Sequence, residues 1–389
     1  MALNEQKKND ATRAVQEVID RHVREGKEIG VQVCAYLGGE ILVDTWAGVT
    51  QTGGDRKVDG NTLFNVFSVS KAICDVALWI QIERGLVDLD APVAKYWPEF
   101  AQNGKEWCTA RHVLYHRSGV PHMPEGTTPE TIRDWGWVID GLARISPLFE
   151  PGTRTAYQCI SQGFMLGEII RRTDSKGRSY KQFVQDEIAA PLGASDLHHG
   201  IPDDVESRVA LMDESEDTMY WAEDTWFRKS IPTAVDLGKG VWERPDMRRA
   251  TVPSTGGIYN ARSEAAFWAM LAGGGQLNGR RILKQETVQS FLTPVPPLDN
   301  TPDPVILMPY IPLGAGGIWL STPFQPAHPG LGPRVLIKPG FGHSIGWADV
   351  DNRFAVAICH NKLFNPHTPA ECRMTPIGDA LRNVLGIRY

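Results

Sequence analysis

The feature that most constrains the fold is that β-rich runs lie near both ends of the chain, while helical patterns fill the middle. Residues 30–48 (GVQVCAYLGGEILVDTWAG) contain two β-rich runs around Gly38 and Gly39, which predicts a hairpin. Three more strands are expected at 334–338, 343–350 and 353–360. This order is not the alternation of βαβ units. It favours one sheet built from both ends of the chain, with a helical region inserted.

Helices are expected before, between and after these strands. Helical spacing and stop signals predict them at 11–25, 70–85, 110–121 (a short helix closed by a turn), 157–172, 178–190, 263–273 and 374–387. The Pro- and Gly-rich stretch 294–334 predicts a long loop over one face. The expected fold class is mixed α/β: an antiparallel sheet flanked by helices. Its sheet part covers about 10–63 and 250–389, and its mainly helical part about 64–249.

Composition excludes several classes of protein. The 389 residues carry a net charge of −6, and no basic block suggests a nucleic-acid partner. No run of 18 apolar residues suggests a membrane span, and the first residues lack the apolar core of a signal peptide. The six cysteines form no C-x-x-C pair, and no metal-ligand motif occurs, so neither a metal nor a cofactor is expected. We expect a cytoplasmic protein with free thiols, and the oligomeric state stays open.

The stretch FNVFSVSKAICDVAL (64–78) carries the first candidate chemistry. Ser68 and Lys71 are three apart, so both side chains would share one face at the start of a helix. A lysine in an apolar wall has a lowered pKa and can take the proton of a serine hydroxyl. Ser70 lacks this spacing, which favours a packing or capping role. The alternative interpretation makes Ser68 an N-cap and Lys71 a solvated helix residue.

Several segments carry a resemblance to a known family. The S-x-x-K stretch resembles the active-site helix of the serine β-lactamase and penicillin-binding-protein superfamily. Four more segments resemble class C β-lactamase-like esterases and transesterases, in the same order along the chain: VLYHRSGVP (113–121), FEPGTRTAYQCISQGFMLGEIIRR (149–172), PSTGGIYNARSEAAFWAMLAGGGQLNGRRILKQETV (253–288) and KPGFGHSIGWAD (338–349). The resemblance covers roughly residues 10–385 and implies a single catalytic domain over 1–389.

The resemblance implies a catalytic group of three residues. Ser68 would be the acyl-accepting nucleophile, Lys71 its base partner, and Tyr157 the phenol that shuttles a proton to the leaving group. Lys338 would be a second cation. A phenol near two lysines is expected to lose its proton below its usual pKa of about 10.

The third segment near the C-terminus supplies the other expected site residues. The resemblance implies an oxyanion hole from the backbone N–H groups of Ser68 and Phe341, with Gly340 keeping the strand free of a Cβ near the substrate. His343 could line the pocket, whereas His116 is expected to be structural.

An aromatic segment follows in the middle of the chain. Residues 219–242 include Trp221 and Trp226 and predict either core of the helical part or an aromatic wall that binds an apolar acyl or alcohol group.

Two departures from the family pattern bear on the substrate. Cys159 stands where a polar residue is usual, and Pro339 replaces the threonine of K-T-G. Both weaken the recognition of β-lactams. The leading function is therefore a serine esterase acting on small-molecule esters. The alternatives are an acyltransferase with an alcohol or amine acceptor, then a β-lactamase or D-amino-acid peptidase, then a non-enzymatic binding protein.

Overall fold

The computed structural model describes residues 3–214, 222–322, 332–366 and 369–388, and within them it has the predicted mixed α/β fold. The main sheet of these residues has six strands in the order β2-β1-β11-β10-β9-β8, and all neighbouring pairs are antiparallel. Their bounds are β1 (Gly30–Leu37), β2 (Glu40–Gly48), β8 (Trp319–Leu320), β9 (Val335–Pro339), β10 (Ile345–Asp349) and β11 (Phe354–His360). β1 pairs with β11, Val31 opposite His360, so both ends of the chain build the sheet as predicted.

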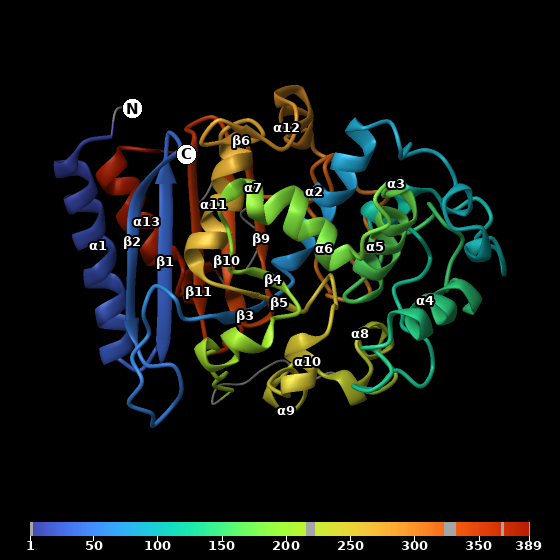
Figure 1. The fold of residues 1–389 in the computed structure, drawn as a ribbon, viewed down its shortest axis with the longest axis horizontal. Coiled ribbons are helices and arrows are strands. Elements are labelled where there is room, and N and C mark those ends of the chain that lie inside the picture. Colours follow the sequence, from blue (N-terminus) through green and yellow to red (C-terminus); the bar gives the residue numbers. More distant parts are fainter. Residues whose placement is uncertain (1–2, 215–221, 323–331, 367–368, 389) are drawn as a thin grey trace.

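Helices cover both faces of this sheet (Figure 1). α1 (Glu5–Arg24) and α13 (Thr375–Leu385) pack side by side on one face, and α11 (Ala261–Ala272) packs on the other. Every residue of β1 and β11 is buried, because helices cover the sheet from both sides. None of the helices in the described residues is long and apolar enough to span a bilayer.

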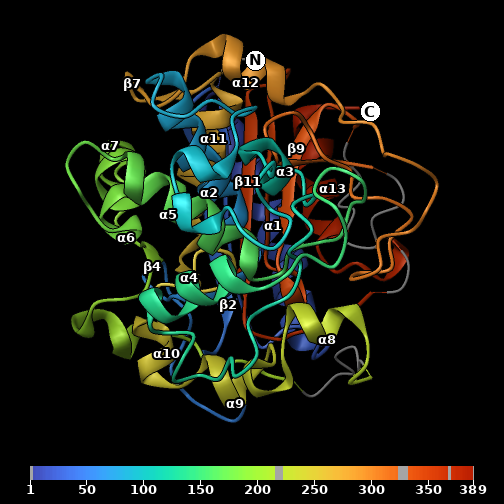
Figure 2. The same ribbon diagram turned by 90° about the vertical axis from the view of Figure 1, so that its right-hand side faces the viewer.

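The middle of the chain forms the helical part, which faces the viewer in Figure 2. Its helices are α2 (Ser70–Glu83), α3 (Ala110–Leu114), α4 (Trp135–Arg144), α5 (Ser161–Thr173), α6 (Tyr180–Val184), α7 (Ala190–Leu192), α8 (Trp226–Ser230), α9 (Lys239–Trp242) and α10 (Pro245–Arg249). The helix expected at 157–172 begins only at Ser161, so Tyr157 lies in the loop before it. The helix expected at 178–190 is α6, a π-helical stretch (Gln185–Ala189) and α7 in succession.

Two short strands lie inside the mainly helical part, and a third follows it. β3 (Phe64–Phe67), β4 (Leu197–His199) and β5 (Gly257–Tyr259) form a second sheet in the order β3-β5-β4. A three-residue strand is too short to show a period of two, so β4 has no clear sequence signal. This sheet matters for the site because only a short turn, which contains Ser68, separates β3 from α2. The hairpin β6 (Gln276–Leu277) and β7 (Arg280–Arg281) and the helix α12 (Gln285–Phe291) complete the strands and α-helices of the described residues.

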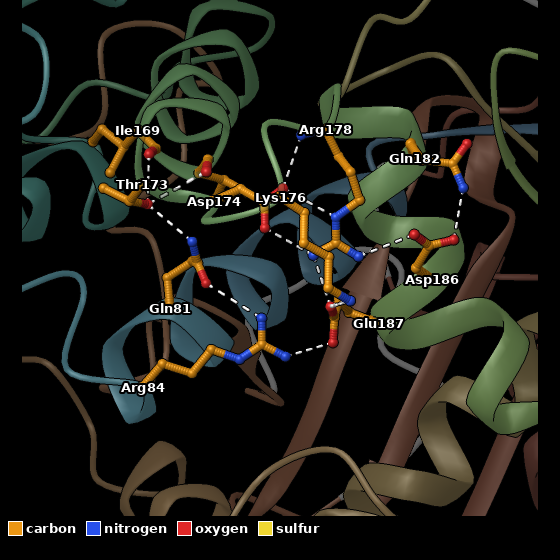
Figure 3. A network of polar contacts seen from close by, with 11 residues as sticks. Gln81, Arg84, Ile169, Thr173, Asp174, Lys176, Arg178, Gln182, Asp186 and Glu187 are labelled. Carbon is orange, nitrogen blue, oxygen red and sulfur yellow. Dashed lines mark hydrogen bonds and ion pairs between the residues drawn. The ribbon is translucent and has the colours of Figure 1, made fainter.

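An ion-pair network joins the end of α2, the turn before α6 and the π-helical stretch Gln185–Ala189 (Figure 3). The Arg178 guanidinium lies 2.8 Å from Asp174, 3.0 Å from Asp186 and 2.7 Å from Glu187. Glu187 also pairs with Arg84, near the end of α2. The network therefore ties three helical segments together through paired charges, away from Ser68.

Candidate active site

Ser68 lies in the sharp turn between β3 and α2. Phe67, the last residue of β3, has a φ of 46°, a left-handed conformation that is rare for a bulky residue. The Phe67 N–H donates a hydrogen bond to the Asn65 side chain (3.1 Å), which supports this conformation. Ser68 is partly exposed, whereas its neighbours from Phe64 to Lys71 are buried. The turn thus presents one hydroxyl at the start of a buried helix.

Ser70 has the structural role that its spacing indicates. Its Oγ donates a hydrogen bond to the carbonyl of Phe67 and accepts one from the Gly257 N–H (3.0 Å). A Cβ at Gly257 would lie 2.4 Å from Ser70 Oγ, so only glycine permits this contact. Ser70 therefore fastens the first turn of α2 to β5.

Lys71 brings an amine to the Ser68 hydroxyl. Its Nζ lies 3.2 Å from Ser68 Oγ, and it also donates to the carbonyl oxygens of Cys159 (2.6 Å) and Ser254 (3.1 Å). The side chain is almost fully buried, and burial lowers the pKa of Lys71 to about 8, the direction that the sequence predicts. The alternative of a solvated helix lysine is wrong, and Ser68 is not an N-cap, because that position belongs to Val69.

Tyr157 lies against the same group from the loop before α5. The Nζ atoms of Lys71 and Lys338 lie 5.0 Å and 5.1 Å from the centre of its ring. Burial raises the pKa of Tyr157 well above its usual value. A hydrogen bond with Ser68 lowers this pKa, but by less than burial raises it. This direction is opposite to the one expected from the two lysines, because burial disfavours the charged phenolate.

Lys338 and Asp75 add two further buried ionisable groups. Lys338 is 1% exposed on β9, with its Nζ 4.0 Å from the centre of the Trp319 ring. Burial and the charge of Lys71 lower its pKa well below the usual value. Asp75 lies one turn beyond Lys71 on α2, and its Oδ1 has no hydrogen-bond partner among the described residues. Burial raises the pKa of Asp75 to about 8, although the positive charges of Lys338 and Lys71 act to lower it.

Gly340 brings the end of β9 to the Ser68 turn. A Cβ at Gly340 would lie 2.1 Å from the carbonyl oxygen of Val66 on β3. The glycine thus permits close packing of two backbones. The Phe341 ring then lies edge-on to the Phe67 ring at 5.6 Å, which places the two segments with the predicted oxyanion-hole donors side by side.

The two candidate histidines pack against other groups. His343 stacks on the Phe364 ring at 4.9 Å, and its Nδ1 lies 2.9 Å from the Phe364 carbonyl oxygen. Burial lowers its pKa to about 4. His116 accepts the Gln158 N–H on Nδ1 (3.2 Å) and packs on the Tyr157 ring at 4.6 Å. It forms part of the wall behind Tyr157, as a structural residue would.

The aromatic segment contributes to the site through a residue that was not singled out. Trp226 stacks on Phe149 at 6.1 Å, and Trp221 lies outside the described residues. Trp242 is buried and packs on Phe67 at 5.9 Å, directly beside the Ser68 turn.

Sequence reasoning also missed Asp75, Trp319 and Ser254. Asp75 follows Lys71 by four residues, and this spacing was an available signal. Trp319 and Ser254 carried no local signal, because their contacts come from segments remote in sequence.

Comparison with known proteins agrees with this geometry. The sequence profile of the family described as Beta-lactamase matches residues 15–375. Esterase/beta-lactamase LipL of Mycobacterium tuberculosis (strain ATCC 25618 / H37Rv) is 29% identical over 356 residues, 87% of this chain and 78% of LipL. The crystal structure of a family VIII carboxylesterase has a TM-score of 0.85 at 27% identity, covering 96% of this chain and 97% of that chain. A penicillin-binding protein homologue from Caulobacter crescentus has a TM-score of 0.84 at 27% identity, covering 96% and 98%. The chain therefore belongs to the beta-lactamase family.

Proposed function

We propose that this chain is a serine esterase that cleaves carboxylic esters through an acyl-enzyme on Ser68. The observation that carries the proposal is the buried Lys71 amine, 3.2 Å from the Ser68 hydroxyl, with a pKa lowered to about 8. Two of the similar proteins are named as esterases, LipL and the family VIII carboxylesterase, which supports an ester substrate.

Each proton in this reaction has a carrier. The Ser68 oxygen bonds to the ester carbonyl carbon while its proton passes to the neutral Lys71 amine. When the carbon–oxygen bond of the ester breaks, the alkoxide leaves as an alcohol with a proton from Tyr157, which Lys71 replaces. Water then attacks the acyl carbon and gives up a proton to the neutral Lys71 amine. When the bond between the acyl carbon and the Ser68 oxygen breaks, Ser68 takes a proton from Tyr157, which Lys71 replaces, and the carboxylic acid is released. The active fraction should grow as the pH rises through about 8, because Lys71 must be neutral.

Intact-mass spectrometry tests the acyl-enzyme and the acceptor together. Incubation with p-nitrophenyl esters of increasing acyl length should add the mass of one acyl group to the wild type and none to Ser68→Ala. Adding a primary alcohol or an amine separates hydrolysis from acyl transfer. A new ester or amide in place of the free acid would favour the acyltransferase alternative.

The first prediction concerns β-lactams. Nitrocefin should be at least a hundredfold poorer in kcat/KM than p-nitrophenyl butyrate. Cys159 and Pro339 replace polar partners, and each lost polar contact costs roughly 1–3 kcal/mol, where 1.4 kcal/mol is about tenfold. Parallel assays of the two substrates decide the matter. Comparable rates on both would overturn the esterase assignment in favour of a β-lactamase.

We also propose a cytoplasmic location. All six cysteines are free and buried, which suits a reducing compartment. Fractionation of source cells with an antibody against the chain would check it.

A further inference from the structure

The carboxyl group of Asp303 lies directly behind the backbone of Tyr157. Its Oδ2 accepts a hydrogen bond from the Tyr157 N–H at 2.8 Å, across 146 positions of sequence. Its Oδ1 accepts from the N–H groups of Val305 and Ile306, both at 2.9 Å. Asp303 is 2% exposed. One buried side chain therefore joins two loops, of which one carries the phenol of the candidate active site.

Asp303 is itself held firmly by its own loop. Its backbone N–H donates to the Met308 carbonyl (2.8 Å), and its carbonyl accepts from the Leu307 N–H (2.9 Å). Tyr157 has no regular secondary structure of its own, because α5 begins only at Ser161. Contacts with other segments must therefore fix its position.

The neighbours of Tyr157 are fixed in a similar way, but by neutral groups. The Ala156 N–H donates to the His116 carbonyl (2.9 Å), and the Cys159 N–H donates to Ser230 Oγ (3.0 Å). The partner of the Tyr157 N–H is instead a carboxyl group. A hydrogen bond to an ionised acceptor is stronger than one to a neutral acceptor.

We propose that Asp303 is a positioning residue that fixes the backbone of Tyr157, so that the phenol stays beside Ser68 and keeps its proton in the resting enzyme. The proposal rests on the proposed ester hydrolysis. The negative charge of Asp303 acts in the same sense as burial, since it raises the pKa of Tyr157. Tyr157 then serves as a proton donor, and Lys71 is left as the base.

A pH dependence follows from the setting of Asp303. Burial raises the pKa of Asp303 to about 6, although its three N–H donors and the positive charge of Arg154 act to lower it. The charge of Asp303 raises the pKa of both Tyr157 and Cys159. The other charged or titratable side chains that line the pocket beside it are Arg117, Arg154, Asp299 and Tyr310. Below about pH 6 the carboxyl group of Asp303 gains a proton, and the protonated oxygen becomes a poorer hydrogen-bond acceptor. The hold on Tyr157 should then weaken.

The pH profile of kcat/KM tests this in two ways. If only Lys71 titrates, log kcat/KM should fall with a slope of one below about pH 8. If protonation of Asp303 also lowers activity, the slope of the wild type should steepen to between one and two below about pH 6. Asp303→Asn keeps the shape but not the charge, so its slope should stay at one. Its kcat at pH 8.5 should fall roughly tenfold to a hundredfold with little change in KM, as expected for a misplaced proton donor.

Asp299→Asn is the matched control. Asp299 lies in the same loop and also accepts a backbone hydrogen bond, from Thr301 at 2.7 Å, but it is exposed. Its profile should match that of the wild type. A wild-type slope of one down to pH 5, or an Asp303→Asn profile like that of Asp299→Asn, would overturn the proposal while leaving ester hydrolysis intact. If Ser68→Ala and Tyr157→Phe were fully active, the proposed function itself would fail. The slope of the wild-type pH profile tests the proposal even if the Asp303→Asn variant does not fold.

Discussion

Two clusters of charged residues in this molecule differ in how their charges are compensated. Around Ser68, burial lowers the pKa of Lys71 to about 8 and raises that of Asp75 to about 8, so both groups are shifted toward their neutral forms. Around Arg178, each charge has partners (Figure 3). Hydrogen bonds to Arg178 lower the pKa of Asp174 to about 2, and Asp174 in turn raises the pKa of Arg178.

The difference separates proton chemistry from stability. A group with a pKa near 8, such as Lys71, exchanges protons at physiological pH. A carboxyl group with a pKa near 2, such as Asp174, stays charged over the whole physiological pH range. The Arg178 cluster can therefore stabilise the helices but cannot move protons. Substitutions in the first cluster should change turnover, and those in the second should change unfolding.

The largest expected effect lies at Ser68, Lys71 and Tyr157. Ser68→Ala, Lys71→Met and Tyr157→Phe should each lower kcat/KM for an activated ester by roughly a thousandfold or more. The Lys71→Met/Tyr157→Phe double variant should be little worse than either one, because the members of one proton-transfer unit are not additive. Denaturant unfolding should show the fold intact. Additive losses would mean that the two residues act separately, and full activity of Ser68→Ala would mean that another nucleophile operates.

The second effect is on stability. Arg178→Ala should lower the free energy of unfolding by on the order of 2 kcal/mol, because it leaves buried Asp174 without its charged partner. The pKa of Asp174 is depressed, so its contribution is present above about pH 4 and is lost as the pH falls toward 2. The difference from the wild type, measured by urea unfolding, should therefore shrink over that range.

Turnover provides the contrast for Arg178→Ala. Its kcat/KM for p-nitrophenyl butyrate should stay within about twofold of the wild type, since the network lies away from Ser68. A large loss of activity in the folded variant would show that the two clusters are coupled, and the comparison would then break down.

The smallest effect concerns Asp75→Asn. The charge of Asp75 raises the pKa of Lys71, so its removal should move the midpoint of the kcat/KM profile below about 8. Asp75 itself titrates near pH 8 and is only partly ionised at this midpoint, so the shift should stay below one pH unit. Glu286→Gln, an exposed carboxylate on α12, is the control. A midpoint that stays in place, or moves to higher pH, would mean that Asp75 does not act on Lys71.

The sequence predicted those parts of the site that depend on local spacing. Ser68 and Lys71 share one turn, and a buried lysine there has the expected lowered pKa. Asp75 was missed because a carboxylate in an apolar helix looks like a surface residue until β9 places Lys338 against it. Asp303 was hidden in a stretch read only as a Pro-rich loop, since its role depends on a contact with Tyr157, far away in sequence. The titration of Tyr157 could not be predicted, because the balance between burial and nearby charge depends on packing.

The fold was predictable to a similar degree. The β-rich runs at the two ends predicted five strands of the main sheet, because each run is long enough to show its own pattern. The sixth strand, β8, has two residues and lies in the stretch 294–334 that was expected to be a loop. β3, β4 and β5 have only three or four residues each, and they form a sheet only where the chain brings them together. The turn that exposes Ser68 depends on this small sheet.

The pairing of β1 with β11 has a consequence for how the chain is made on the ribosome. Val31 can pair with His360 only after the 328 residues between them have also been synthesised (360 − 31 − 1). At a synthesis rate of about 5–20 residues per second, the edge of β1 that later pairs with β11 stays unpaired for roughly 20 seconds to a minute. During that time the hairpin offers unpaired backbone groups to other nascent chains. We therefore expect a chaperone that covers the β1 edge during synthesis to raise the yield of folded protein, and to be needed only until β11 emerges.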